Sequence, residues 1–526
     1  MRKTICALVA LLLLTSCAGA GGGEDGAPSA PSAAPPADSP PPIISVPPAV
    51  PSGDGRFSLR FNPASTLNPL TGEDADNMAL STLCYEGLFA LNADFTYRNV
   101  LCESFESADF LTYDFTFVAG VYMSDGDELS PYDVVYSIEQ AKAGARYGGR
   151  LKNVVSAEVI GPRTVRVEME IPNARLPALL DIPIIKDGAS GTVPRGCGPY
   201  KYAGDGEARL VKNTYHRDAA RLPIDAIYLV SCADAQLGEY FTEQRIDLIA
   251  ENSSAPVSSA RRDHEARYYY TTVLQFIGFN PRAAAVDDVR FRAAVEAAAD
   301  REAIVQSCLG TRGAASRLAL PPFYRLYEST WEGTGSSAGL SALLGAIGMT
   351  DADSDTYLEY PVDGVMTPFS LDFIVGAGND ARLAAAKSVS DALRRVGLNI
   401  TLRELPFEEF KQALEAGDFD MYYGETRLPA DFDLSALVGT GGALNYGNVG
   451  GEEYDALLGA FLAARGDFAE RGAARELCER IRDERPFIPI AYRQYAVYSG
   501  RNEIAGLEPS QTGVFCNIAD WTIEIK

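Results

Sequence analysis

The sequence has few of the residues that most enzymes use for catalysis or metal binding. Only two of its 526 residues are histidine, His216 and His264, and only two are tryptophan. Both histidines stand in polar or charged stretches and are expected to face solvent. HExxH strings, zinc-spaced Cys/His clusters, EF-hand loops and GxxxxGK[ST] phosphate loops are all missing. These absences favour a binding protein over an enzyme, and no cofactor or directly bound metal is expected.

One short string does look catalytic. Gly335-Ser336-Ser337-Ala338-Gly339 matches GxSxG, the turn that carries the serine of α/β-hydrolases. It lies in a run of small residues rather than between a strand and a helix, and no histidine follows Ser337 to complete a triad. A secreted hydrolase is therefore only a remote alternative, and no catalytic residue is predicted.

Positive charge is scarce as well. Lys and Arg number 46 against 71 Asp and Glu, so the formal net charge is −25. Because binding to phosphates needs a basic face, nucleic acid is excluded as a partner. Beyond the N-terminal segment no stretch approaches 18 consecutive apolar residues, so no membrane-spanning helix is expected there.

The N-terminus predicts secretion and a lipid anchor. Arg2 and Lys3 precede an apolar run over residues 5–14, too short to span a bilayer of about 30 Å and typical of a signal peptide. Leu14-Thr15-Ser16-Cys17 resembles the lipobox of bacterial lipoproteins, which implies cleavage after residue 16 and lipidation of Cys17. Ten of the 31 prolines follow between residues 28 and 51, so residues 17–53 are predicted to be an unfolded tether.

The remaining cysteines do not form a disulfide framework. Once Cys6 leaves with the signal and Cys17 is lipidated, an odd set without a CxxC pair remains: Cys84, Cys102, Cys197, Cys232, Cys308, Cys478 and Cys516. Cysteines scattered through apolar contexts are usually free core residues. A single Cys84–Cys102 bridge is the alternative left open.

The periodicity of the globular body, which begins near residue 54, indicates an α/β fold. Alternating strands are predicted at 57–61, 113–117 and 164–170, and a strand buried on both faces at 226–230. Residues 288–305 have a helical pattern. A βαβ unit follows, with strands at 371–375 and 398–402, a helix between them that stops at Gly397, a second helix from Phe407 and an extended run at 419–423. Ligands bind beyond the carboxyl ends of parallel strands, which makes the segment after Tyr423 a candidate site.

Several strings occur in a fixed order along residues 57–526. They are Leu67-Asn68-Pro69-Leu70, Tyr85-Glu86-Gly87-Leu88, the stretch 115–136 (FTFVAGVYMSDGDELSPYDVVY), Gly198-Pro199-Tyr200, Asn280, Asp288-Val289-Arg290, Ala299-Asp300-Arg301 and Pro486-Phe487-Ile488-Pro489-Ile490. Together they resemble the bacterial extracellular solute-binding proteins of family 5, which serve peptide and nickel importers. Their own chemistry is that of a scaffold: Ser130 is a natural helix N-cap with Pro131 at the first turn, and Asp300 and Arg301 are expected to pair.

The resemblance implies a two-lobed, periplasmic-binding-protein-like α/β fold of type II, in the large peptide-binding subclass, with a subdomain inserted in the first lobe. The expected divisions are a signal peptide at 1–16, the tether at 17–53, lobe I at 54–90, the inserted subdomain at 91–195, lobe I again at 196–269, lobe II at 270–490 and a return to lobe I at 491–526.

The resemblance also implies ligand contacts. Peptide-binding relatives carry a "GW..D" string after a lobe II strand, and its aspartate pairs with the α-amine of the ligand. The matching stretch here runs from Tyr422 to Asp433 without the tryptophan, which makes Asp431 the first candidate and Asp433 the second. Arg427 is expected either to pair with Asp431 or to receive a ligand carboxylate. The remaining candidates are Tyr423, Glu73 and Asp74 in an acidic turn, and Gln275 where the chain enters lobe II.

The function implied is capture of peptides for an ABC importer, by a monomeric lipoprotein on the extracytoplasmic face of the membrane. Its permease and ATPase would be separate chains, since this one has neither a phosphate loop nor spanning helices. Two alternatives stay open: the same fold holding a metal chelate, an oligosaccharide or another small solute, and a sensory lipoprotein without transport.

Overall fold

The computed structural model describes residues 55–189, 191–250, 263–282, 284–333 and 339–524. The predicted signal peptide, Cys17, the tether and Ser337 lie outside these described residues. Within them, no helix has both the length and the apolar character needed to cross a bilayer.

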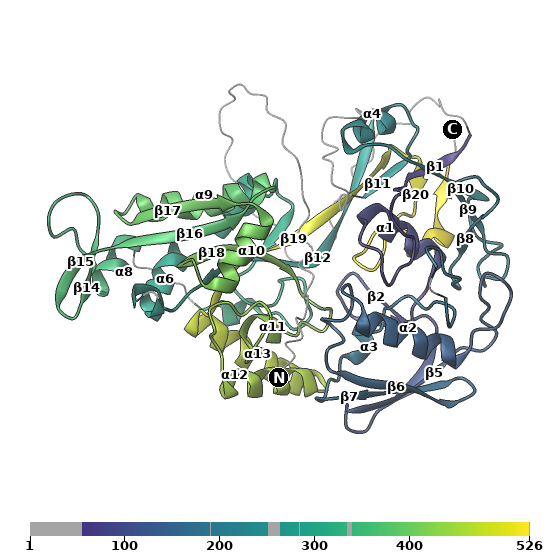
Figure 1. The fold of residues 1–526 in the computed structure, drawn as a ribbon, viewed down its shortest axis with the longest axis horizontal. Coiled ribbons are helices and arrows are strands. Elements are labelled where there is room, and N and C mark those ends of the chain that lie inside the picture. Colours follow the sequence, from purple (N-terminus) through teal and green to yellow (C-terminus); the bar gives the residue numbers. More distant parts are fainter. Residues whose placement is uncertain (1–54, 190, 251–262, 283, 334–338, 525–526) are drawn as a thin grey trace, which may run out of the picture.

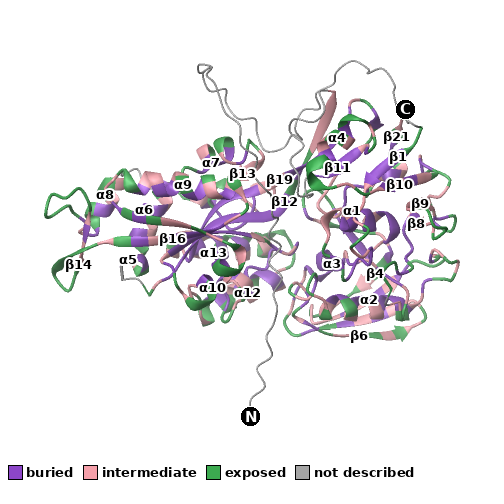
Figure 2. Cartoon of the chain, turned by 45° about the horizontal axis from the view of Figure 1, so that its top comes forward, coloured by how far each residue is buried: buried purple, intermediate pink, exposed green. Residues whose placement is uncertain are grey.

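Two lobes are joined by two long antiparallel strands, β12 (His264–Phe279) and β19 (Phe487–Gly500) (Figure 1). Both strands belong to one sheet in the order β17-β16-β18-β12-β19-β11-β1-β10-β9-β8, with β13 added on β19. The predicted boundaries 269/270 and 490/491 fall inside these strands. Most of the residues in these two connecting strands are buried (Figure 2).

Lobe I holds one end of this sheet and an inserted subdomain. Its own elements are β1 (Phe57–Arg60), α1 (Ala75–Cys84), β8 (Tyr200–Tyr202), β9 (Arg209–Lys212), β10 (Ala226–Val230), α4 (Leu237–Thr242), β11 (Leu248–Ala250), β20 (Ile504–Ala505) and β21 (Thr522–Ile523). The subdomain consists of β2 (Phe89–Leu91), β3 (Tyr97–Asn99), β4 (Cys102–Glu106), β5 (Thr112–Phe117), α2 (Pro131–Ala143), β6 (Val154–Gly161), β7 (Thr164–Met169) and α3 (Leu176–Leu179).

Lobe II covers the other end of the sheet with helices. Its strands are β13 (Gly313–Ala315), β14 (Glu359–Val362), β15 (Val365–Pro368), β16 (Ser370–Gly376), β17 (Asn399–Leu405) and β18 (Met421–Arg427). Its helices are α5 (Ala284–Asp287), α6 (Val289–Ala298), α7 (Arg301–Ser307), α8 (Leu340–Ala346), α9 (Asp380–Arg394), α10 (Phe407–Ala416), α11 (Ser435–Val438), α12 (Glu452–Ala463) and α13 (Asp467–Glu484).

The predicted βαβ unit is confirmed. Strand β16 pairs in parallel with both β17 and β18, and α9 and α10 connect them. Helix α9 buries Ala386, Val389 and Leu393 against this sheet, as the helical spacing predicts. The chain leaves α9 through Gly397, whose φ of 92° is left-handed and disfavours any side chain.

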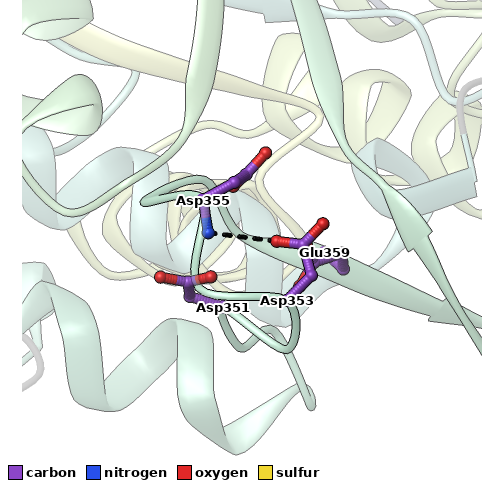
Figure 3. Close-up of side chains that lie close together, drawn as sticks. All are labelled: Asp351, Asp353, Asp355 and Glu359. Atoms are coloured by element: carbon purple, nitrogen blue, oxygen red, sulfur yellow. Dashed lines mark hydrogen bonds between the residues drawn. The ribbon is translucent and has the colours of Figure 1, made fainter.

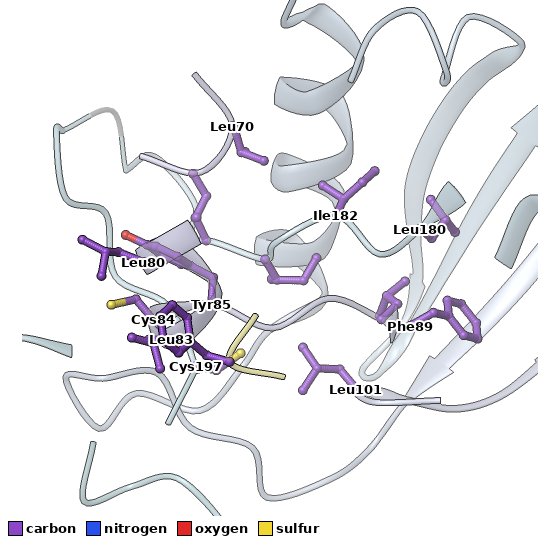
Figure 4. Packing of buried hydrophobic residues seen from close by; sticks show 14 of the residues in the cluster. Leu70, Leu80, Leu83, Cys84, Tyr85, Phe89, Leu101, Leu180, Ile182 and Cys197 are labelled. Atoms are coloured by element: carbon purple, nitrogen blue, oxygen red, sulfur yellow. The ribbon is translucent and has the colours of Figure 1, made fainter. Parts of the chain in front are cut away.

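The sequence strings that carry the family resemblance also form the local structures expected of them. Ser130 caps α2 and forms a capping box with Asp133, and Pro131 opens the helix. The Gly198 turn packs directly on the end of α1, where a Cβ at Gly198 would lie 2.3 Å from the backbone carbon of Cys84. Figure 4 shows the surrounding core, in which Cys84, Tyr85 and Cys197 pack among leucines and isoleucines.

Three expectations were wrong. His216 is only 8% exposed, because it packs with Nε2 3.4 Å from Glu86 Oε1, while His264 is half-buried as well. Strand β10 alternates between buried and half-buried residues instead of being buried on both faces. Asp300 caps α7, and Arg301 pairs with Glu296 at 3.0 Å rather than with Asp300. Cys84 and Cys102, by contrast, are buried free thiols as expected, which excludes the alternative of a bridge between them.

Candidate functional site

A cavity of about 1520 Å³ lies between the two lobes. Its walls come from α1 and the following turn, from the α2–β6 connection of the inserted subdomain, from the end of β18 with the loop to α11, and from residues 510–520. Pockets for drug-sized ligands measure roughly 300–1,000 Å³. The cavity therefore has room for a solute larger than a single amino acid, enclosed by both lobes.

Asp431 is the most deeply buried carboxylate in this wall. It is only 2% exposed, its Oδ2 accepts a hydrogen bond from Asn173 Nδ2 at 2.9 Å, and its Oδ1 accepts one from the Asp433 N–H at 3.1 Å. Burial, and next the neighbouring Asp433, raise the pKa of Asp431 to about 6. Among the described residues, no Lys, Arg or His nitrogen lies within 4 Å of this carboxylate.

The backbone places Asp431 and Asp433 by an unusual turn. Phe432 between them adopts φ 57°, a left-handed conformation that bulky residues rarely take. Its fully buried ring compensates by packing on Phe95 of the subdomain at 5.8 Å and on Tyr324 at 4.3 Å between ring centres. The turn is therefore held by contacts from both lobes.

Asp433, unlike Asp431, has a cation partner. Lys152 Nζ of the inserted subdomain lies 3.4 Å from Asp433 Oδ2. The same carboxylate accepts the Ser435 N–H at 2.9 Å and the Ser435 hydroxyl at 2.6 Å, which starts α11. Its hydrogen-bonding capacity is largely used inside the protein.

Arg427 lies exposed at the end of β18, on the wall of the cavity. Its guanidinium carbon lies 5.9 Å from the centre of the Tyr495 ring, and within the described part of the chain no carboxylate comes within 4 Å of it. The structure thus does not bring Arg427 and Asp431 into an ion pair. A planar guanidinium in this position can receive a carboxylate in a two-bond fork.

Tyr423 and Gln275 are fully buried and do not line the cavity. The Tyr423 hydroxyl donates to Gln275 Oε1 at 3.0 Å, and Gln275 Nε2 donates to Glu425 Oε2 at 2.7 Å. Glu425 does line the cavity, and Arg493 Nη1 lies 3.5 Å from it. The two predicted residues therefore support Glu425, which the sequence analysis missed although it shares the Tyr423 side of β18.

The two acidic residues predicted on lobe I have different positions. Glu73 is exposed on the cavity wall. Asp74 caps α1, because its Oδ1 accepts the Asn77 N–H at 3.0 Å and its Oδ2 accepts Asn62 Nδ2 at 2.7 Å. Asn173 was missed altogether, and its partner Asp431 is 258 residues away, so no local pattern points to it.

The fold and the cavity define a two-lobed binding protein. A sequence model described as "Bacterial extracellular solute-binding proteins, family 5 Middle" matches residues 96–440, which is more than half of the chain. The chain belongs to this family. It is therefore a member of a family of solute-binding rather than catalytic proteins that act outside the cytoplasm.

Individual relatives agree with this assignment. The glutathione-binding protein GsiB of Escherichia coli K12 is 29% identical over 151 residues, and that of Salmonella typhimurium is 30% identical. The matched stretch spans 26% of this chain and only 30% of either relative.

Solved structures match over far more of the chain. The oligopeptide-binding protein AppA of Bacillus subtilis, in complex with a nonapeptide, is 18% identical, with coverage of 89% of this chain and 99% of that one and a TM-score of 0.66. NikA of Brucella suis, in complex with Fe(III)-EDTA, is 20% identical, with coverage of 89% and 100% and a TM-score of 0.71. At these identities the likeness shows the shared fold alone.

Proposed function

We propose that this chain is an extracytoplasmic substrate-binding lipoprotein that captures peptides and delivers them to an ABC permease. The observation that carries the proposal is Asp431, a buried carboxylate on the cavity wall with no Lys, Arg or His nitrogen within 4 Å among the described residues. The cation that lowers its raised pKa is the more distant Arg175 guanidinium. A buried charge is costly unless a partner of opposite charge is present. The α-ammonium group of a peptide is such a partner.

The opposite end of a peptide has a matching group. Arg427 is exposed in the same cavity, and its guanidinium suits the ligand carboxylate. The size of the cavity and the nonapeptide held by a protein of the same fold agree with a peptide of several residues. Glu73, at the lobe I wall, is the third predicted contact, and Asp433 also lines the cavity but is already bound by Lys152 and Ser435. Tyr423, Gln275 and Asp74 support the site from behind the cavity wall.

The experiment is a binding titration on the purified mature protein. Thermal unfolding is followed with free di- to hexapeptides and with the same peptides after N-acetylation. A ligand at about one hundred times its Kd should add roughly 2.7 kcal/mol to the free energy of unfolding. We expect this gain with free amines only, and its loss in Asp431→Asn. Equal gains before and after acetylation would contradict the anchoring role of Asp431.

An anionic solute such as a metal chelate is the second candidate. Three arginines line the cavity and have no carboxylate within 4 Å in the described residues: Arg98, Arg146 and Arg427. NikA, of the same fold, holds Fe(III)-EDTA. Such a ligand offers no ammonium group, so it should stabilise the wild type and Asp431→Asn equally. Mass spectrometry of the solute that copurifies with the protein separates the two candidates directly.

The lipid anchor and the transport role belong to the same proposal. Cys17 follows a signal-like segment, and the family is extracytoplasmic. Metabolic labelling with an alkyne fatty acid should mark the wild type and not Cys17→Ala. Peptide uptake by cells should fall in Cys17→Ala if the anchored monomer supplies a permease, whereas unchanged uptake would favour a sensory role.

A further inference from the structure

The inserted subdomain contacts lobe II at a second place, away from the β12–β19 connection. Residues 173–175 make three hydrogen bonds across the cleft: Asn173 Nδ2 to Asp431 Oδ2 at 2.9 Å, the Ala174 N–H to Leu462 O at 2.8 Å, and Arg175 Nη1 to Phe461 O at 2.6 Å. The Arg175 guanidinium also stacks over the Phe461 ring at 4.0 Å. We call residues 173–175 the latch segment.

The latch segment is held rigidly by its own subdomain. The Asn173 N–H donates to Phe110 O, and Asn173 O accepts the Tyr113 hydroxyl at 2.7 Å. The Asn173 side chain completes a turn by accepting the Arg175 N–H at 2.9 Å. The amide end that faces Asp431 is therefore fixed before the lobes meet.

Apolar residues surround these polar contacts. Phe95 and Ala178 of the subdomain lie in one buried cluster with Tyr324, Phe432 and Phe461 of lobe II. Asn173 itself is only 1% exposed. Hydrogen bonds shielded from water in this way are costly to leave unmade. In the closed arrangement seen here the three bonds across the cleft are made, although Nε and Nη2 of Arg175 are buried without a hydrogen-bond partner.

We propose that the latch segment holds the cleft closed, and that Asn173 positions the Asp431 carboxylate for the ligand; the second half of this statement rests on the proposed function. A carboxylate has about four acceptor positions, and two of them are taken by Asn173 Nδ2 and the Asp433 N–H. The remaining positions stay available for an ammonium group. When the latch opens, water replaces Asn173 and solvates Asp431, so the ammonium binds the closed state better and its binding shifts the lobes towards closure.

The first arm of the test is hydrogen exchange of the Ala174 amide, which reports the latch with or without a known ligand. We expect slow exchange in the wild-type protein and at least ten-fold faster exchange in Asn173→Ala. The matched control is Asn213→Ala in lobe I: Asn213 is also fully buried, donates to Gly198 O at 2.9 Å and accepts the Tyr215 N–H at 3.2 Å, but it contacts no residue of lobe II. Equal exchange in all three proteins would overturn the latch.

The second arm measures the Kd of free and N-acetylated peptides by calorimetry. Because a hydrogen bond to a charged group is lost, Asn173→Ala should weaken binding of free peptides roughly ten-fold or more, and that of acetylated peptides much less. Equal weakening for both would show a merely structural role for Asn173. If no peptide binds the wild type, the proposed function fails. Hydrogen exchange of the Ala174 amide still tests whether the latch segment holds the cleft closed. Asn173→Ser keeps an oxygen for the Arg175 N–H but is too short to reach Asp431, and it replaces the alanine variant if that one does not fold.

Discussion

Lobe II carries two groups of carboxylates whose surroundings differ sharply. Asp431 and Asp433 are buried at the cleft. Asp351, Asp353, Asp355 and Glu359 lie near β14, on the projecting part of the lobe where exposed residues predominate (Figures 2 and 3). One oxygen from each of these four lies within 4.8 Å of the others, which is close enough to surround a metal ion, yet the three aspartates are exposed and only Glu359, at 6%, is buried.

The difference between the two groups shows that the burial of a carboxylate, and not the number of acidic residues around it, indicates the need for a cation partner. Charges 4 Å apart in water interact by only about 1 kcal/mol, and salt screens them further. The exposed group near β14 can therefore persist without a partner. Asp431 lacks that screening, and the two hydrogen bonds it accepts do not neutralise its charge. Under the proposed function a ligand cation supplies the opposite charge at the cleft, whereas no cation is required near β14.

The largest effect should come from removing the charge of the buried group. Asp431→Asn keeps the shape of the side chain but leaves a ligand ammonium without its partner. Breaking a buried ion pair costs about 3–5 kcal/mol, so the Kd of a free-amine peptide should rise more than a hundred-fold. The matched variant Asp353→Asn should leave it unchanged. Calorimetry of both variants checks this, and equal effects would remove the distinction between the two groups.

The second-largest effect should appear in the pH dependence of the free energy of unfolding, which depends on the buried Asp431 rather than on the exposed carboxylates near β14. The pKa of Asp431 is raised to about 6 in the folded protein, so the folded state binds its proton more tightly than the unfolded state. In the unliganded protein this carboxyl therefore costs nothing below the ordinary aspartate pKa near 4. It becomes increasingly destabilising as pH rises from about 4 to about 6, and the loss levels off above that. Relative to Asp431→Asn, the wild type should lose on the order of 2–3 kcal/mol between pH 4 and pH 7.

Urea unfolding of both proteins across that range measures the difference. Asp76, whose burial raises its pKa to about 6 as well, is present in both and cancels. Binding of a free-amine peptide should show the opposite trend and weaken below pH 6, because only the ionised carboxylate attracts the ammonium. A flat difference curve would mean that Asp431 is better solvated than its burial indicates.

Local patterns predicted much of the fold. The alternation at 371–375 and 398–402, and the helical spacing between them, follow from short-range periodicity, so β16, α9 and β17 were found. The Ser130 cap depends on only four residues and was found for the same reason.

The site was only partly predictable, since its partners are distant in sequence. Asp431 was identified through a resemblance, but nothing near it indicates Asn173. Burial of His216 likewise depends on Glu86, which is 130 residues away. Tyr423 and Gln275 were placed on the right strands, and Tyr423 shares a side of β18 with Glu425, which lines the cavity. How far along a strand the cavity reaches is decided by the arrangement of the two lobes.

A smaller effect is expected when Asp433 loses its ion-pair partner. Its partner Lys152 keeps 44% of its side chain exposed, so the ion pair is screened by solvent. Lys152→Met should cost about 0.2–1 kcal/mol of the free energy of unfolding and change peptide Kd by less than ten-fold. Parallel urea unfolding and calorimetry check both values. An effect on Kd as large as that of Asp431→Asn would show that the Lys152–Asp433 pair contributes to peptide binding as much as Asp431 does.

The smallest effect should come from the carboxylates near β14. Asp353 Oδ1 accepts the Asp355 N–H at 3.1 Å, and Asp355 Oδ1 accepts the Tyr357 N–H at 2.7 Å. Asparagine retains both acceptors, so the double variant Asp353→Asn and Asp355→Asn removes charge and little else. In buffer with a chelator, the free energy of unfolding should stay within about 0.5 kcal/mol of the wild type, because exposed like charges repel only weakly. A loss above about 1 kcal/mol would mean that these charges stabilise the loop despite their exposure, and burial alone would then no longer distinguish the two groups.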